Sequence, residues 1–163
     1  KSTMKRSDFL NKLRKEGKLE LVEPSEEIKE SYTKKSESNL ASAKILLASN
    51  KLEEAVALAY YSMYHLLTAL LFKAGIKSEN HSASIILLKE VFVLDNKEIK
   101  FAKSERVDKQ YYVDFSVTKE EVKEAIRKAE VFNSQMLDFI SRLTNEEIGV
   151  YRNKFQDILK PIF

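Results

Sequence analysis

A chain of 163 residues with 44% hydrophobic residues can bury one core, and its three glycines and two prolines are too few for the turns of an all-β or βαβ fold. The absence of cysteine excludes disulfides, zinc ribbons and thiolate nucleophiles, and it is compatible with the reducing cytoplasm in which we expect the protein to reside. The net charge of +3 is only mildly basic, well short of an obvious nucleic-acid footprint. These properties favour an all-α protein.

The N-terminal part of the chain predicts a short appendage. It has no apolar signal segment, and we expect residues 1–3, which precede Met4, to be an expression remnant. Residues 7–16 have the spacing of a short amphipathic helix, and residues 17–24 predict a linker. The sequence therefore predicts an N-terminal helix and linker over residues 1–24.

The main body begins with a long helix over residues 25–49. Ser25 is a suitable N-cap, and the two glutamates that follow it favour the positive end of the helix dipole. A tight connection at Asn50 then predicts that the next helix, residues 51–74, runs antiparallel to the first.

The second long helix carries the most informative pattern in the chain. Residues 55–72 contain no charged side chain, although one-third of all residues are charged. A run of this length raises the question of a membrane span, but Tyr60, Tyr61 and Tyr64 have polar tips unsuited to the centre of a bilayer. We therefore expect the central helix of a water-soluble bundle, no membrane contact, and tyrosines that pack with their hydroxyls hydrogen-bonded.

The rest of the chain predicts further helices. They lie near residues 82–94, around 101–112, over 118–143 and over 145–159. Capping boxes that begin at Thr118 and Thr144 open the last two helices. Residues 25–143 are thus expected to form an up-and-down bundle of about five helices. Residues 144–163 form a C-terminal helix, so that short helices flank the bundle at both ends.

The two histidines, His65 and His81, limit the metal chemistry. A di-iron bundle needs a glutamate three residues before each histidine, but Ser62 and Ser78 occupy those positions. We expect no metal and no cofactor. His65 is expected to be a core or interface histidine bonded to a hydroxyl. His81 is expected either to cap the helix that follows or to face an anion beside free backbone N–H groups.

The segment 103–114 is the strongest candidate for a ligand site. It combines Arg106 and Lys109 with two adjacent tyrosines, Tyr111 and Tyr112. Arginine pairs with phosphate oxygens through two N–H groups, and tyrosine stacks on bases or bonds to phosphates. An ordinary polar connection with aromatic anchors fits the same residues equally well.

Three stretches form a recognisable pattern: Asn39–Leu47, then AYYSMYHLLTALL with the following Gly75 and His81, then Arg106-x4-Tyr111 ahead of the TKEEVKEAI helix. Taken together, they resemble the HEPN family, whose name abbreviates higher eukaryotes and prokaryotes nucleotide-binding. The resemblance covers about residues 30–142. It implies a bundle of about five helices that often dimerises. It also implies a metal-independent endoribonuclease, or a toxin–antitoxin pair with a minimal nucleotidyltransferase.

The family's ribonuclease motif is an arginine, then four to six intervening residues, then a histidine. By the resemblance, Arg106 stands where that arginine does, but Tyr111 and Tyr112 stand where the histidine is expected. The pKa of tyrosine lies about three units above neutral pH, so its basic form is scarce by about a thousandfold.

Three functions therefore remain open. The first is binding of a nucleotide, RNA or a nucleotidyltransferase partner through Arg106, Lys109, Tyr111, Tyr112 and His81. The second is an RNase in which Arg106 binds phosphate and Tyr111, or a borrowed histidine, handles the proton. The third is a non-catalytic dimerisation module, since a homodimer is expected.

Overall fold

The computed structural model describes residues 2–110 and 116–159, and within them the chain folds into seven helices and two short strands. Seventy-nine per cent of the structure is helical, so the predicted all-α bundle is confirmed. The elements in chain order are α1 (Ser2–Lys15), β1 (Leu19–Leu21), α2 (Glu26–Ala48), α3 (Leu52–Lys73), β2 (Ile76–Ser78), α4 (His81–Glu90), α5 (Lys97–Gln110), α6 (Lys119–Arg142) and α7 (Asn145–Leu159).

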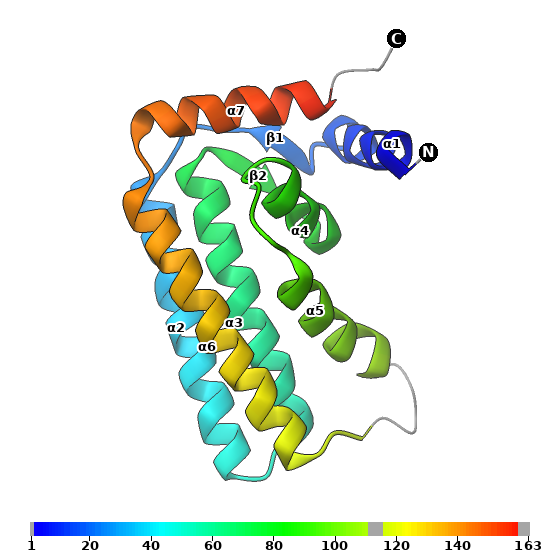
Figure 1. The fold of residues 1–163 in the computed structure, drawn as a ribbon, viewed down its shortest axis with the longest axis vertical. Helices are drawn as coiled ribbons and strands as arrows, with labels where there is room; N and C mark the ends of the chain where they lie inside the picture. Colours follow the sequence, from blue (N-terminus) through cyan, green and yellow to red (C-terminus); the bar gives the residue numbers. More distant parts are fainter. Residues whose placement is uncertain (1, 111–115, 160–163) are drawn as a thin grey trace.

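Helix α3 is the centre of the bundle, as its uncharged run predicts. Helices α2 and α6 pack along one side of it, and α4 and α5 cover the other side (Figure 1). Helix α7 crosses one end of the bundle and contacts α1. Among the described residues α3 is the one helix long and apolar enough to cross a membrane. Because 72% of its apolar window is buried inside the bundle, a core helix accounts for that composition.

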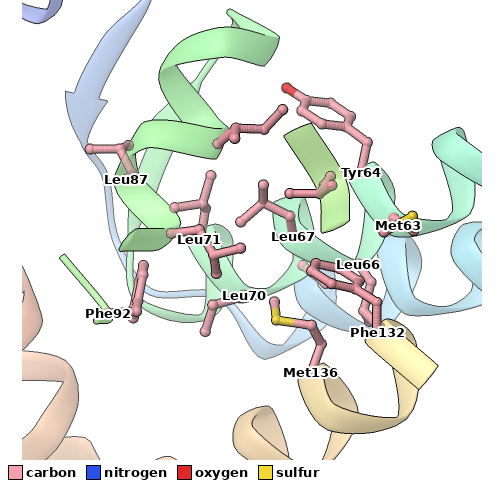
Figure 2. Close-up of a cluster of buried hydrophobic side chains, with 14 of the residues drawn as sticks. Met63, Tyr64, Leu66, Leu67, Leu70, Leu71, Leu87, Phe92, Phe132 and Met136 are labelled. Carbon is pink, nitrogen blue, oxygen red and sulfur yellow. The ribbon is translucent and has the colours of Figure 1, made fainter. Parts of the chain in front are cut away.

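The core is built around the leucines of α3. Leu66 and Leu70 lie with Phe132 and Met136 of α6 in one cluster of buried side chains (Figure 2). Burying a side chain of this size stabilises the fold by about 1.5–3 kcal/mol relative to exposure. A layer of this kind fixes α3 against α6 and leaves the opposite side of α3 to face α4 and α5.

The helix starts are capped as the sequence predicts. The Ser25 hydroxyl accepts a hydrogen bond from the Ile28 N–H at 3.1 Å. Thr118 and Glu121 form a reciprocal capping box at the start of α6. Thr144 pairs with Glu147 in the same way at the start of α7. These local interactions satisfy backbone N–H groups that have no partner inside the helix.

A small antiparallel sheet corrects the prediction of a simple linker and loop. Strand β1 pairs with β2, with Leu19 opposite Ser78 and Leu21 opposite Ile76. Leu19 and Ile76 are both fully buried, so the pairing also closes one end of the core. The sheet leads directly into α4 and therefore fixes where that helix starts.

Gly75 and Arg152 hold this corner together. Gly75 has a φ of 76°, in the left-handed region that favours glycine, and it ends α3 before the chain enters β2. The Arg152 guanidinium of α7 donates to the backbone carbonyls of Val22, Ala74 and Gly75 at 2.7–3.1 Å. One side chain thus joins α7, the end of β1 and the end of α3.

Three helix boundaries differ from the predictions. Helix α1 begins at Ser2 rather than residue 7, and α5 begins at Lys97 rather than residue 101. Helix α4 ends at Glu90 rather than residue 94, because Val93 adopts a φ of 56° and the Leu94 N–H bonds back to the Leu88 carbonyl. The predicted division into residues 1–24, 25–143 and 144–163 stays a prediction.

Candidate functional site

A polar cleft of about 320 Å³ opens between α3, the start of α4 and α5. We call it the Arg106 cleft. Its described lining combines two cations, two hydroxyl groups, an amide and an imidazole, and it includes no carboxylate. The lining residues are Tyr61, Asn80, His81, Ser82, Lys103 and Arg106. A positive potential and many hydrogen-bond donors are the properties that phosphate-bearing ligands require.

Arg106 is held in place by tyrosine rings rather than left in open solvent. The carbon at the centre of its guanidinium lies 4.4 Å from the ring centre of Tyr61 and 5.8 Å from that of Tyr60. One of its N–H groups donates to the Tyr61 hydroxyl. A guanidinium carries five N–H donors, so others remain for a ligand. Lys103 stands three residues earlier on α5, which places both cations on one face of that helix.

His81 is the first residue of α4, and Asn80 is the N-cap. The Asn80 side chain accepts a hydrogen bond from the Ala83 N–H at 2.9 Å, so the prediction that His81 caps the helix is wrong. An amide oxygen reaches the N–H of the third residue from the cap position, and His81 lies one residue too late for this. Its imidazole instead lies against the Tyr64 ring, with ring centres 3.7 Å apart and planes inclined by 12°.

The Nδ1 side of the His81 ring faces the core. Its Nδ1 lies 2.7 Å from the hydroxyl of Tyr60, a residue with no exposed surface. Burial lowers the pKa of His81, and the nearby ammonium of Lys103 lowers it further. His81 is therefore neutral at physiological pH.

The tyrosines of α3 pack with their hydroxyls paired, as predicted. The Tyr64 hydroxyl lies 3.2 Å from the Ser84 hydroxyl, which in turn donates to Ser78 at 2.8 Å. Burial raises the pKa of Tyr60 and of Tyr64, so both phenols keep their protons at neutral pH. They position the cleft residues and do not supply charge.

His65 lies one turn along α3 from Tyr61, outside the lining of the Arg106 cleft. Its Nδ1 lies 2.6 Å from Oδ1 of Asn39, so the predicted hydroxyl partner is wrong: the partner is an amide on α2. Burial lowers the pKa of His65 to about 4, with smaller effects of Lys35 and His81. Its ring stacks on Tyr61 with centres 6.0 Å apart, which supports the tyrosine that holds Arg106.

Two of the five predicted ligand residues, Arg106 and His81, come together in the cleft. Tyr111 and Tyr112 lie outside the described residues, and the same is true of the side chain of Lys109. The proposed binding and catalytic roles of these residues remain predictions.

Three cleft residues were missed in the sequence: Tyr61, Asn80 and Ser82. Lys103 lies inside the predicted segment 103–114 but was not named as a ligand residue. The three-residue spacing of Lys103 and Arg106 was the available signal. Tyr61 gave none, because it lies inside an apolar run that predicts core packing.

A second hollow, of about 170 Å³, lies between α3, α5 and α6 on the other face of α5. Its lining is mainly apolar, with Val56, Met63 and Phe101 among the residues, and it also includes four glutamates. Carboxylates repel phosphate, so this hollow does not suit the same ligand. Among the described residues, no group of three histidines or acidic side chains that could hold a metal ion is found.

Comparison with known proteins agrees with the bundle and its sequence pattern. The HEPN domain model matches residues 29–139. A UPF0332 protein of Thermotoga maritima is 32% identical over 130 residues, which cover 74% of this chain and 94% of that protein. A UPF0332 protein of Pyrococcus horikoshii is 43% identical over 56 residues, which cover 34% of this chain and 39% of that protein. No solved structure matches. The chain therefore belongs to the HEPN domain family and to the UPF0332 proteins.

Proposed function

We propose that this protein binds a phosphate-bearing ligand, a nucleotide or RNA, in the Arg106 cleft. The single observation that carries the proposal is the convergence of Arg106, Lys103 and His81 on one open cleft without a described carboxylate. The first turn of α4 adds backbone N–H groups at the positive end of a helix dipole.

The state of Arg106 supports this assignment. Its guanidinium lies over the Tyr61 ring and is bonded to the Tyr61 hydroxyl, so its orientation is set before a ligand arrives. A preoriented donor loses less conformational entropy on binding than a free side chain does. A planar guanidinium also matches two phosphate oxygens at once, which an ammonium does not.

The test is binding of a fluorescently labelled single-stranded RNA, with AMP as a competitor. Arg106→Ala is expected to weaken binding about ten- to a hundredfold, because a charge-assisted hydrogen-bonded contact is lost. The affinity of Arg106→Lys is expected to lie between those of the wild type and Arg106→Ala. Lysine keeps the positive charge but cannot contact two phosphate oxygens at once. Arg127→Ala on α6 is the matched control, because Arg127 is exposed and paired with Glu124. Equal affinities for the Arg106→Ala and Arg127→Ala variants would contradict the proposal.

Salt dependence separates a nucleotide from RNA. A single-stranded RNA that covers several basic groups loses affinity steeply with salt, with a log–log slope of about −0.7 per neutralised phosphate. A mononucleotide held by one phosphate group gives a shallow slope. This measurement assigns the ligand class within the proposed function.

A second candidate function is a metal-independent RNase, and one observation favours it. His81, an imidazole, lines the same cleft as Arg106 although it is remote from it in sequence. The expected result under this candidate is RNA cleavage in the presence of EDTA that disappears in His81→Asn. Binding without cleavage would leave the first proposal in place and remove the second.

The expected partners are proposals drawn from the family resemblance. A minimal nucleotidyltransferase partner, a toxin–antitoxin role and a homodimer are each testable. Co-purification of the protein with the products of neighbouring genes tests the first two, and light scattering on dilution tests the third.

A further inference from the structure

Burial leaves the hydroxyl of Tyr60 few possible hydrogen-bond partners. The Tyr60 side chain has no exposed surface, and within the described part of the chain the partner of its hydroxyl is Nδ1 of His81, at 2.7 Å. Burial raises the pKa of this phenol, so the hydroxyl keeps its hydrogen at neutral pH. A buried O–H group with one acceptor in reach donates to that acceptor, since the alternative leaves its hydrogen unpaired.

We propose that Tyr60 fixes the tautomer of His81: the phenol donates to Nδ1, the ring hydrogen resides on Nε2, and the Nε2–H group is the donor that His81 presents to the cleft. Tyr60 is thereby a positioning residue. It does not line the Arg106 cleft, and it acts there only through the imidazole. A neutral imidazole in this form is a hydrogen-bond donor at Nε2 and has no lone pair there to accept a proton.

The surroundings of His81 hold the ring in this orientation. Its face lies against Tyr64 at 3.7 Å, and the Tyr64 hydroxyl lies within 3.2 Å of Ser84 in the first turn of α4. The Asn80 cap fixes the backbone immediately before the ring. A flip of the imidazole by 180° would place a carbon against the Tyr60 hydroxyl and break the hydrogen bond. The stacking therefore fixes the plane of the ring, and the hydrogen bond selects between its two flipped orientations.

The consequence for the cleft is a third donor beside Arg106 and Lys103. The use of this donor for phosphate rests on the proposed function, whereas the tautomer itself does not. The tautomer also restricts the RNase candidate, because His81 in this form is not available as a general base. In an RNase built on this cleft His81 would donate to phosphate, and the general base would be another residue.

His65 provides an internal reference of the opposite kind. Its Nδ1 lies 2.6 Å from Oδ1 of Asn39, an atom that only accepts hydrogen bonds. His65 therefore carries its hydrogen on Nδ1. The chain contains two histidines, so one spectrum reports a ring of each tautomer.

The experiment is a long-range ¹H–¹⁵N correlation spectrum of the imidazole rings in the ¹⁵N-labelled protein at pH 7.5, with His81→Asn used to assign the signals. We expect Nε2 of His81 to carry the hydrogen by at least about tenfold over Nδ1, and His65 to show the reverse. In Tyr60→Phe, which removes one oxygen and keeps the ring, the Nδ1–H form of His81 is expected to rise several-fold. Tyr64→Phe keeps the Tyr60 hydrogen bond and should leave the tautomer unchanged.

The possible results of this experiment separate the tautomer proposal from the proposed function. An Nδ1–H or doubly protonated His81 in the wild-type protein overturns the proposal, whatever the protein binds. An unchanged tautomer in Tyr60→Phe also overturns it, since the phenol would then not be the cause. If Tyr60→Phe does not fold, the wild-type spectrum alone decides the position of the hydrogen. The proposed tautomer together with no response to added AMP or RNA would contradict the proposed function and leave the role of Tyr60 standing.

Discussion

The two sides of α3 are built from different chemistry. Toward α6 the helix presents apolar side chains such as Leu66 and Leu70, which meet Phe132 and Met136 (Figure 2). Toward α4 and α5 it presents aromatic rings whose polar atoms each have a named partner. The first side supplies burial, which depends on shape and volume. The second supplies hydrogen bonds, which depend on particular atoms.

This difference shows how one helix serves both stability and a site. Tyr60 is buried between the core and the cleft. Tyr61, the next residue, accepts a hydrogen bond from Arg106 through its hydroxyl. Because the rings are anchored in the core, the cleft donors are positioned before any ligand binds. Substitutions on the α6 side should therefore change stability, whereas those on the cleft side should change binding.

The largest effect is expected for Leu70→Ala on the α6 side. Leu70 is fully buried, and removal of its side chain leaves a cavity that the packed core fills only partly. We expect a loss of about 3–4 kcal/mol in the free energy of unfolding, measured by denaturant titration. The control is Ile45→Ala, because Ile45 is 66% exposed and its truncation should change stability by less than about 0.5 kcal/mol. Similar losses in both variants would contradict the assignment of the core.

Gly75→Ala should have the next largest effect. Its φ of 76° disfavours any side chain, and a methyl group there would overlap the Arg152 guanidinium and the Val22 carbonyl oxygen. We expect a loss of about 2–3 kcal/mol.

The matched control for this position is Gly149→Ala in α7, where a methyl group meets nothing within 4 Å. That substitution should stabilise the protein by about 0.5–1 kcal/mol, since alanine favours helix. If Gly75→Ala were as stable as wild type, the inferred stabilising contact between Arg152 of α7 and the end of α3 would be contradicted.

The long helices and the small sheet differ in how far the sequence could predict them. The helices at 26–48, 52–73 and 119–142 follow from caps and apolar spacing, which are local signals. Strands β1 and β2 have three residues each and lie more than fifty positions apart, so their pairing leaves no local pattern. That pairing sets the start of α4, and hence the position of His81 against Tyr60.

The site was predictable only in part for the same reason. Arg106 was predicted from the residue types of segment 103–114 and from the family resemblance, and His81 from its place at the mouth of a helix. Tyr61 was assigned to the core because its neighbours in sequence are apolar, and only the packing of α5 against α3 brings Arg106 to it. Long-range packing, rather than residue type, turns this tyrosine into a site residue.

A smaller, pH-dependent effect is expected at His65. Its pKa is about 4 in the folded protein against 6.5 ordinarily, so the unfolded chain binds the proton first as the pH falls. The stabilising contribution is complete above pH 6.5 and is lost as the pH falls toward 4. After a discount for the partly exposed ring, the change is about 1–2 kcal/mol.

The measurement is the difference in free energy of unfolding between wild type and His65→Gln at pH 7 and pH 4. The glutamine amide retains a polar contact for Asn39, and the titration of the carboxylates cancels in the comparison. A difference that stays constant with pH would contradict the lowered pKa of His65.

The smallest effect on stability is expected for Tyr61→Phe on the cleft side. The substitution keeps the ring under Arg106 and removes only the hydroxyl that accepts its N–H. We expect a stability change below about 1 kcal/mol, because one partly exposed hydrogen bond is lost. Ligand affinity should fall by up to about tenfold, since Arg106 is no longer held in one orientation. A large loss of stability with unchanged binding would reverse the distinction between the two sides of α3.

The most direct test of the central claim is a chemical-shift map of the ¹⁵N-labelled protein titrated with AMP. The account predicts that the largest backbone shifts fall on Tyr61, Asn80, Ser82, Lys103 and Arg106, with α2 and the outer face of α6 unchanged. Shifts centred on any other surface, or no shifts at millimolar AMP and with added RNA, would contradict phosphate binding in the Arg106 cleft.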